Sequence, residues 1–96
     1  VGMYSPSASG NMGVALFQDS TANALAAVGC TVNGGNEVFT IPLIYQMQAG
    51  TTSSTTFKIR AGHASGSIAM NGQGGAATRL YGGVAYSGLA ITEIFI

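Results

Sequence analysis

Glycine recurs every few residues along this chain, and that spacing limits its secondary structure more than any other feature. Fifteen glycines stand among 96 residues, and each glycine in a helix interior costs about 1 kcal/mol relative to alanine. Long helices are therefore not expected. The remaining signal is an alternation of apolar and polar residues with period two, which indicates half-buried β-strands.

The alternation is clearest in residues 41–48 and 55–61, on either side of a run of serine and threonine at 51–54. In the first segment the odd-numbered residues are apolar, and Ile44 is the one apolar residue out of register. We predict that the two segments are the strands of a hairpin joined by the Ser/Thr loop.

Shorter apolar segments predict further strands, and two Asn-Gly sequences mark turns between them. A single helical turn at 21–28 is the alternative for the alanine-rich part of the chain. Many short strands with regular turn signals are typical of an all-β, antiparallel β-sandwich or jelly roll. The further strands are predicted at 1–4, 13–18, 23–32, 66–70 and 87–96.

A chain of this length forms a single domain with one small core. Its only linker-like piece is residues 5–10, which are rich in serine and contain a proline and a glycine. We therefore divide the chain into an N-terminal arm or partial strand, residues 1–12, and a jelly-roll domain, residues 13–96.

Charged residues are unusually few, and three acids balance three bases. Without a cationic surplus the chain lacks the attraction to phosphate that drives nucleic-acid binding, so nucleic acid is not expected as a partner. No stretch approaches about 20 consecutive apolar residues, so membrane insertion is not expected either. A monomer with so few charges would have poor colloidal stability, and we expect other chains to cover much of the surface.

Groups that could carry catalysis are scattered. His63, the only histidine, is expected in a loop after a strand, although a threefold assembly would bring three copies of it onto one axis. Small residues around Cys30 indicate a buried structural thiol, and a catalytic pair would require this thiol to meet His63. The carboxylates at 19, 37 and 93 are isolated. We predict no catalytic residue, no metal site and no cofactor.

Four segments follow one another in a particular order: residues 14–27 (VALFQDSTANALAA), 49–62 (AGTTSSTTFKIRAG), the pair NG at 71–72 with LYGGV at 80–84, and the closing LAITEI at 89–94. In this order they resemble bacteriophage tail-fibre and appendage domains. Those domains are similar to the trimeric jelly roll of the tumour-necrosis-factor and complement-head superfold. The resemblance covers most of the chain from Gly13 onward.

The resemblance implies a homotrimer displayed on a virion. Its role would be structural and non-enzymatic, with other virion proteins as partners. As a fibre tip or appendage it would contact the host cell, with a surface glycan as the candidate ligand. A capsid head-decoration or cement protein and a secreted, self-assembling bacterial adhesin or lectin-like protein are the alternatives. Such domains usually begin with an extra strand pair, so we expect an incomplete sandwich that a neighbouring chain, or another portion of the same protein, completes with a strand.

Loops at the ends of a sandwich are the expected receptor surface. Tyr81 and Tyr86 are candidate platforms for stacking a sugar, the alternative being that they lie in the trimer core. The candidate receptor-contact residues are Asn33, Asn36, Thr52, Ser53, Gln73 and Arg79.

Charges on the predicted strands are the candidate contacts between subunits. Glu93 shares its side of the last strand with Leu89 and Ile91, so it either meets a base across the interface or begins an exposed face. The candidate trimer-interface charges are Lys58, Arg60 and Glu93.

Overall fold

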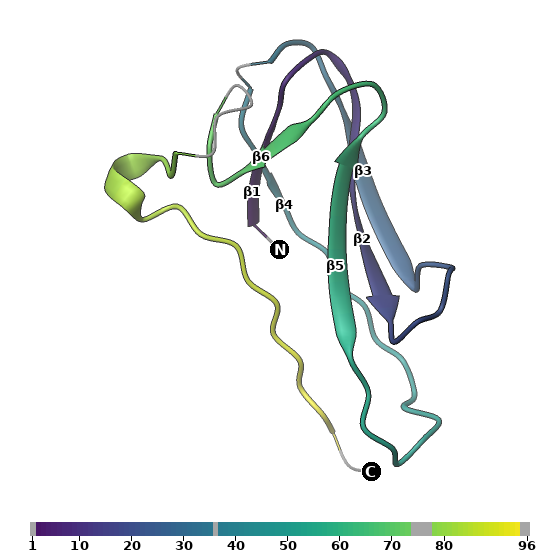
Figure 1. Ribbon diagram of the computed structural model, residues 1–96. Coiled ribbons are helices and arrows are strands. Elements are labelled where there is room, and N and C mark those ends of the chain that lie inside the picture. Colours follow the sequence, from purple (N-terminus) through teal and green to yellow (C-terminus); the bar gives the residue numbers. More distant parts are fainter. Residues whose placement is uncertain (1, 36, 74–77, 95–96) are drawn as a thin grey trace.

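The chain folds into six β-strands in two three-stranded antiparallel sheets, as seen in a computed structural model that describes residues 2–35, 37–73 and 78–94 (Figure 1). One sheet has the strand order β4-β1-β6 and the other β3-β2-β5. The all-β antiparallel class is thus confirmed, and the architecture is compatible with a β-sandwich. The strands are β1 (Gly2–Pro6), β2 (Gly10–Gln18), β3 (Ala26–Val32), β4 (Phe39–Ile41), β5 (Phe57–His63) and β6 (Ile68–Met70).

The hydrophobic core lies between the two sheets, and the central strand of each contributes to it. On β2 the inward residues Met12, Val14 and Leu16 are at most 7% exposed, which matches the alternation in the sequence. Tyr4 of β1 and Ile41 of β4 face them from the other sheet. Because β2 pairs with β3 on one side and β5 on the other along most of its length, it has the most complete backbone hydrogen bonding of the described strands.

β1 is the central strand of the smaller sheet, between β4 and β6. The strand expected at 1–4 is therefore present, and it continues through Ser5 and Pro6, which are buried despite their linker-like composition. Of residues 1–12, those from 2 to 6 form β1 and those from 10 to 12 begin β2.

The predicted hairpin of residues 41–48 and 55–61 is wrong. β4 ends at Ile41 and pairs with β1, whereas β5 pairs antiparallel with β2. The reason is that β2 is a better partner for β5 than residues 41–48 are. Leu16 of β2 lies directly opposite Ile59 of β5, so apolar side chains of the two strands meet on the core face. Pro42, directly after β4, has no N–H to donate to a further rung.

One alternative and one further expectation also fail, whereas the strand expected at 23–32 is present as β3. The helical turn at 21–28 is absent, because residues 21–25 turn the chain and Ala26 already begins β3. The strand expected at 87–96 is absent over its described part, residues 87–94, which belong to no sheet. Only a short 3₁₀ turn, η1 (Tyr81–Gly83), precedes that segment.

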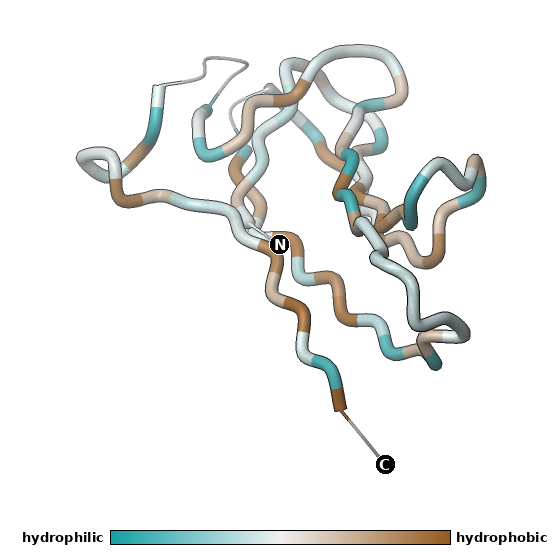
Figure 2. Tube along the Cα trace, turned by 60° about the horizontal axis from the view of Figure 1, so that its bottom comes forward, coloured by the Kyte–Doolittle hydropathy of each residue, from teal (hydrophilic) through white to brown (hydrophobic). Residues whose placement is uncertain are grey.

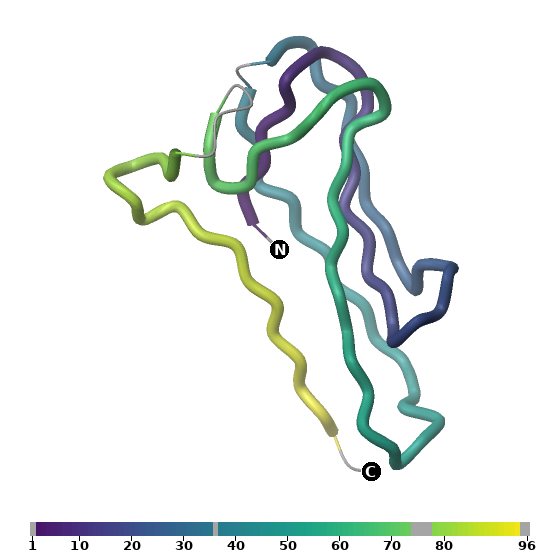
Figure 3. Tube along the Cα trace, viewed as in Figure 1, coloured from purple at the N-terminus to yellow at the C-terminus, as the bar shows by residue number. Residues whose placement is uncertain are grey.

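The molecule is more open than its length requires. Its radius of gyration is 14.9 Å, whereas a compact domain of this length is expected near 12.5 Å. Its accessible surface is 6398 Å², against about 5,100 Å² for a compact monomer of this mass. Figure 3 shows the cause, which is two extended stretches of chain that reach away from the sheets.

Candidate functional site

An open groove lies between the two extended stretches. We call residues 42–55 the mid-chain segment and residues 87–94 the C-terminal segment. Both start beside the first residues of β1 and run in the same direction, as Figures 1 and 2 show. The groove holds about 680 Å³. Its floor is formed by Leu16, Gln18 and Phe57, and its walls by residues 43–47, 49, 51–55 and 89–94.

The mid-chain segment forms one wall without pairing to any described strand. Its last neighbour in a ladder is Ile41, which lies opposite Gly2 of β1. Beyond that point Ile44 is 94% exposed, Tyr45 46% and Met47 39%. Leu43 packs against the core, whereas Ile44 is in water and Tyr45 and Met47 are partly exposed. The backbone N–H and C=O groups of this stretch are not paired with a described strand.

The C-terminal segment forms the other wall and is held at its start. A Cβ on Gly2 would coincide with the Cβ and Oγ of Ser87, so the two backbones touch there and only glycine fits. The Ser87 hydroxyl donates to Asn71 Oδ1 at 3.0 Å. Asn71, at a φ of 63°, also donates its N–H to the Met3 carbonyl oxygen at 2.8 Å. These contacts tie the start of the segment to β1.

After Ser87 the segment makes no hydrogen bond to any other described residue. Leu89 is 46% exposed, Ile91 63% and Ile94 75%. Figure 2 shows hydrophobic stretches along both walls, with hydrophilic residues between them. The groove therefore combines apolar side chains with two unpaired strand edges.

The end of the floor is fixed by one acid. Asp19 adopts a φ of 49° after β2, and its N–H donates to the Thr56 carbonyl oxygen at 2.8 Å. Its Oδ1 accepts from the Thr56 N–H at 2.9 Å. Asp19 thus extends the pairing of β2 with β5 past Phe57, and it positions the point at which the mid-chain segment returns to the sheet.

The candidate receptor residues do not form one surface. Residues 33–35 and 51–55 lie at opposite ends of the molecule (Figure 3). Thr52 and Ser53 are exposed and line the groove. Asn33 is exposed, with its N–H donated to Glu37 Oε1 at 2.8 Å.

The remaining candidates are divided between structural contacts and the surface. Arg79 donates from Nε and Nη2 to the Ala85 carbonyl oxygen, at 2.8 and 2.6 Å, so it closes the turn around η1. Gln73 is exposed, and Asn36 lies outside the described residues.

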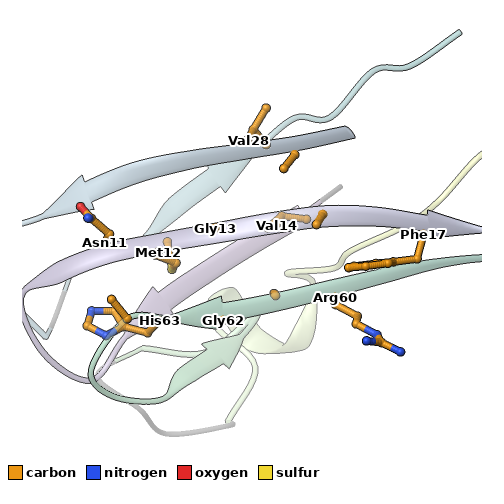
Figure 4. Close-up of a pocket in the computed structure, with 13 residues that line it drawn as sticks. Asn11, Met12, Gly13, Val14, Phe17, Val28, Arg60, Gly62 and His63 are labelled. Atoms are coloured by element: carbon orange, nitrogen blue, oxygen red, sulfur yellow. The ribbon is translucent and has the colours of Figure 1, made fainter. Parts of the chain in front are cut away.

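The three candidate interface charges are all exposed. Lys58 and Arg60 are on β5, with side chains on the face away from the core. The Arg60 guanidinium lies 4.7 Å from the centre of the Phe17 ring, and Figure 4 shows both side chains at the same end of the sheet face. Glu93 lines the groove and has no ion pair or hydrogen bond with the described residues.

The middle of the outer face of the larger sheet is lined by glycines. Gly13 pairs with Gly29 on one side and Gly62 on the other, which makes a row of three glycines across the sheet. Figure 4 shows Gly13 and Gly62 on their neighbouring strands. Arg60 and Phe17 stand at one side of this row and Asn11 at the other.

The sole cysteine and the sole histidine are kept apart by β2. Cys30 and His63 are both register partners of Met12, one on each side, so about 9–10 Å of sheet separates their backbones. His63 Nδ1 accepts from the Ser65 N–H at 3.1 Å, and its Nε2 is buried without a partner among the described residues. The two side chains do not form a catalytic pair.

Tyr81 and Tyr86 are 69% and 73% exposed and line a second hollow of about 600 Å³ beside the C-terminal segment. Its other lining residues are small or apolar apart from Thr40. The hollow offers ring faces but few hydrogen-bonding side chains.

No protein-family model, curated protein or solved structure matches the chain. Within the described ranges no helix has the length and apolar character needed to cross a membrane. Nor do three His, Cys, Asp or Glu side chains of those ranges lie close enough together to hold a metal ion.

The groove was not predicted from the sequence as a site, although one signal pointed to it. Ile44 interrupts the alternation of residues 41–48, and it is the most exposed large apolar residue of the described chain. An apolar residue on the polar side of a strand indicates a second face that other protein covers.

Proposed function

We propose that the chain is a non-enzymatic structural domain of a virion, assembled as a homotrimer at a fibre tip or appendage and contacting the host cell surface. The observation that carries the proposal is the concentration of exposed apolar side chains along two unpaired segments of a chain with only six charges. Such a surface is unfavourable in water and is typical of a protein covered by other subunits. The assignment to a virion rests on the resemblance of the sequence to phage appendage domains.

Adhesion is supported by a separate observation. Tyr81 and Tyr86 present exposed rings at the second hollow, and aromatic rings are suited to stacking on the apolar face of a sugar. In a head-decoration protein the same surface would face capsid subunits, and in a bacterial adhesin it would act without a virion.

The mass in solution tests the assembly. Sedimentation should give a mass of three chains of 9.6 kDa each, or a multiple of that mass. A monomer at micromolar concentration would contradict the proposal. Glu93→Gln tests the interface charge: loss of the trimer supports a pair with Lys58 or Arg60 across subunits, and an unchanged mass excludes it.

Host contact is tested by binding to bacterial surface polysaccharides. The unaltered protein should bind, and the double variant Tyr81→Ala, Tyr86→Ala should lose at least tenfold in affinity. Binding by neither protein, to polysaccharides or to whole cells, would contradict host contact but leave a structural role.

A further inference from the structure

The chain contains two Asn-Gly sequences, and the structure holds them differently. They are Asn33-Gly34, directly after β3, and Asn71-Gly72, directly after β6. Asparagine is a chemically labile residue, and a following glycine makes it more so, because glycine has no Cβ to hinder its own backbone nitrogen from reaching the asparagine side chain. Whether the reaction occurs in a folded protein depends on how freely the two residues rotate.

Asn71-Gly72 is held by three hydrogen bonds. The Asn71 N–H donates to the Met3 carbonyl oxygen at 2.8 Å, and the Asn71 carbonyl oxygen accepts from the Leu80 N–H at 2.9 Å. Asn71 Oδ1 accepts from the Ser87 hydroxyl at 3.0 Å, and Gly72 is buried. Turning the side chain onto the Gly72 nitrogen would break the bond to Ser87, and turning the peptide plane would break the bond to Leu80.

Asn33-Gly34 makes one hydrogen bond within the described ranges, and it does not involve the reacting groups. The Asn33 N–H donates to Glu37 Oε1 at 2.8 Å. The Asn33 side-chain amide, the Asn33 carbonyl oxygen and the Gly34 N–H have no hydrogen bond with a described residue. Asn33 is exposed, so water reaches it. Both rotations that the reaction requires therefore cost no hydrogen bond to the described chain.

We propose that Asn33 converts spontaneously to aspartate and isoaspartate in the folded protein, while Asn71 stays an asparagine. The Gly34 nitrogen loses its proton to hydroxide or to a buffer base and attacks Cγ of Asn33. The new N–Cγ bond closes a succinimide ring as the Cγ–Nδ2 bond breaks, and the leaving amide takes up a proton and departs as ammonia. Water then adds to either ring carbonyl and opens the ring. The chain continues to Gly34 through the original carbonyl carbon in aspartate and through Cγ in isoaspartate.

The products change the charge of this corner. Three acids balance three bases along the chain, so the new carboxylate adds one negative charge to a protein with no formal net charge. It arises beside Glu37, whose carboxylate accepts from the Asn33 N–H at 2.8 Å. The two like charges repel each other, which weakens that hydrogen bond.

Isoaspartate also lengthens the backbone at a crowded place. A Cβ on Gly35 would lie 2.7 Å from the Ser7 carbonyl oxygen, so the connection from β3 to β4 packs against the connection from β1 to β2. Ser7 donates its N–H to the Ser67 carbonyl oxygen at 2.8 Å, and its Oγ accepts from the Ser67 N–H at 2.9 Å. Three connections between the sheets thus meet at Ser7. An added methylene group at position 33 displaces Gly35 from this contact, and we expect the product to melt at a lower temperature.

The conversion goes beyond the proposed function, because it requires neither a virion nor a threefold axis. The two proposals also fail separately. A monomer in sedimentation would contradict the homotrimer and leave the conversion standing. An intact trimer in which Asn33 does not react would leave the homotrimer standing and overturn the conversion.

Ageing of the unaltered protein tests the conversion. Samples are held for days at mildly alkaline pH, then separated by isoelectric focusing and mapped by peptide mass, and an isoaspartyl methyltransferase detects the isomer. The same protein in urea gives the rate of each site without structure. We expect Asn33 to react at least about tenfold faster than Asn71 in the folded protein, and at a similar rate in urea. Equal rates in the folded protein overturn the proposal, as does a folded Asn33 that stays unchanged while the unfolded one reacts.

Three variants assign the reaction to its residues. Gly34→Ala is accommodated, because the added Cβ meets only Glu37 Oε1 at 3.8 Å, but its methyl group hinders the attack and should slow the conversion several-fold. Asn33→Gln should abolish it, because the longer side chain closes a larger ring much more slowly. Ser87→Ala removes one hydrogen bond of Asn71 and should speed reaction there without changing Asn33. Conversion at an unchanged rate in Gly34→Ala overturns the mechanism.

The melting temperature tests the structural consequence. The isoaspartyl fraction of the aged protein is compared with fresh Asn33→Asp, which carries the added charge but not the longer backbone. We expect the isoaspartyl fraction to melt below Asn33→Asp, and aged Asn33→Gln to melt like the fresh variant. An isoaspartyl fraction that melts with the fresh, unaltered protein overturns the displacement of Gly35 from Ser7.

Discussion

The strands of the larger sheet and the two walls of the groove have similar sequences, but only the strands are buried and paired. Ile59 on β5 and Ile91 in the C-terminal segment are both isoleucines in alternating segments. Ile59 lies opposite Leu16 and packs on the core, whereas Ile91 is 63% exposed and has no strand beside it. The difference lies in the neighbour rather than in the residue. An alternating sequence is suited to a β-strand, but the segment becomes a strand only where the edge of another strand is available for pairing.

The largest expected effect contrasts two leucines. Leu16→Ala should destabilise the fold by about 2–5 kcal/mol, because it leaves a cavity where Leu16 is 7% exposed. Leu89→Ala, at 46% exposure, should cost less than about 1 kcal/mol in the dissociated chain. Urea unfolding at low protein concentration measures both. Equal losses would mean that the C-terminal segment is packed within its own chain.

The next effect concerns the point where the C-terminal segment is held. Gly2→Ala forces a methyl group into Ser87, and overpacking of this kind costs about 1–3 kcal/mol. Gly62→Ala is the matched control, because nothing lies within 4 Å of its added Cβ. Thermal unfolding should show a clearly lower melting temperature for Gly2→Ala and an unchanged melting temperature for Gly62→Ala. A harmless Gly2→Ala would mean that Ser87 does not rest against β1.

A smaller effect is expected where the mid-chain segment rejoins the sheet. Asp19→Ala removes the acceptor for the Thr56 N–H, at a cost of about 1 kcal/mol. Asp19→Asn should keep most of the stability, because the amide oxygen still accepts and asparagine tolerates a positive φ. If both substitutions cost the same in urea unfolding, the hydrogen bond does not set this end of the sheet.

The smallest effect is on the outer face. Arg60→Gln removes the cation above the Phe17 ring and should cost about 0.5–1 kcal/mol. Lys58→Gln, on the same strand face, is the control and should cost nothing measurable. Identical stabilities of the two variants at several salt concentrations would exclude a contribution from the ring contact.

The sequence predicts the strands of this fold better than their pairing. The strands β3, β5 and β6, and β2 from residue 13 onward, follow from alternation and turn signals. The hairpin fails because alternation says nothing about which edge a strand meets, and β2 competes successfully with the mid-chain segment for β5. The final strand fails for the related reason that no described edge is available beside residues 87–94.

The candidate site was predictable only in part. The open shape is compatible with the expected incomplete sandwich, and Thr52, Ser53 and Glu93, which were predicted for receptor or subunit contacts, line the groove. Arg79, a candidate receptor-contact residue, is exposed, and its guanidinium also closes a turn through the Ala85 carbonyl oxygen, a contact that the sequence did not predict. A contact between a side chain and a backbone carbonyl leaves no mark in composition or periodicity.

Hydrogen exchange at two protein concentrations tests the central claim most directly, because it reports whether the backbone amides of the walls are paired. We predict that amides of residues 43–47 and 89–94 are protected at high concentration and exchange freely on dilution, while those of β2 stay protected at both. Wall amides that are equally protected at every concentration would show that the groove closes within one chain. Wall amides that are never protected would show that no other subunit pairs with them.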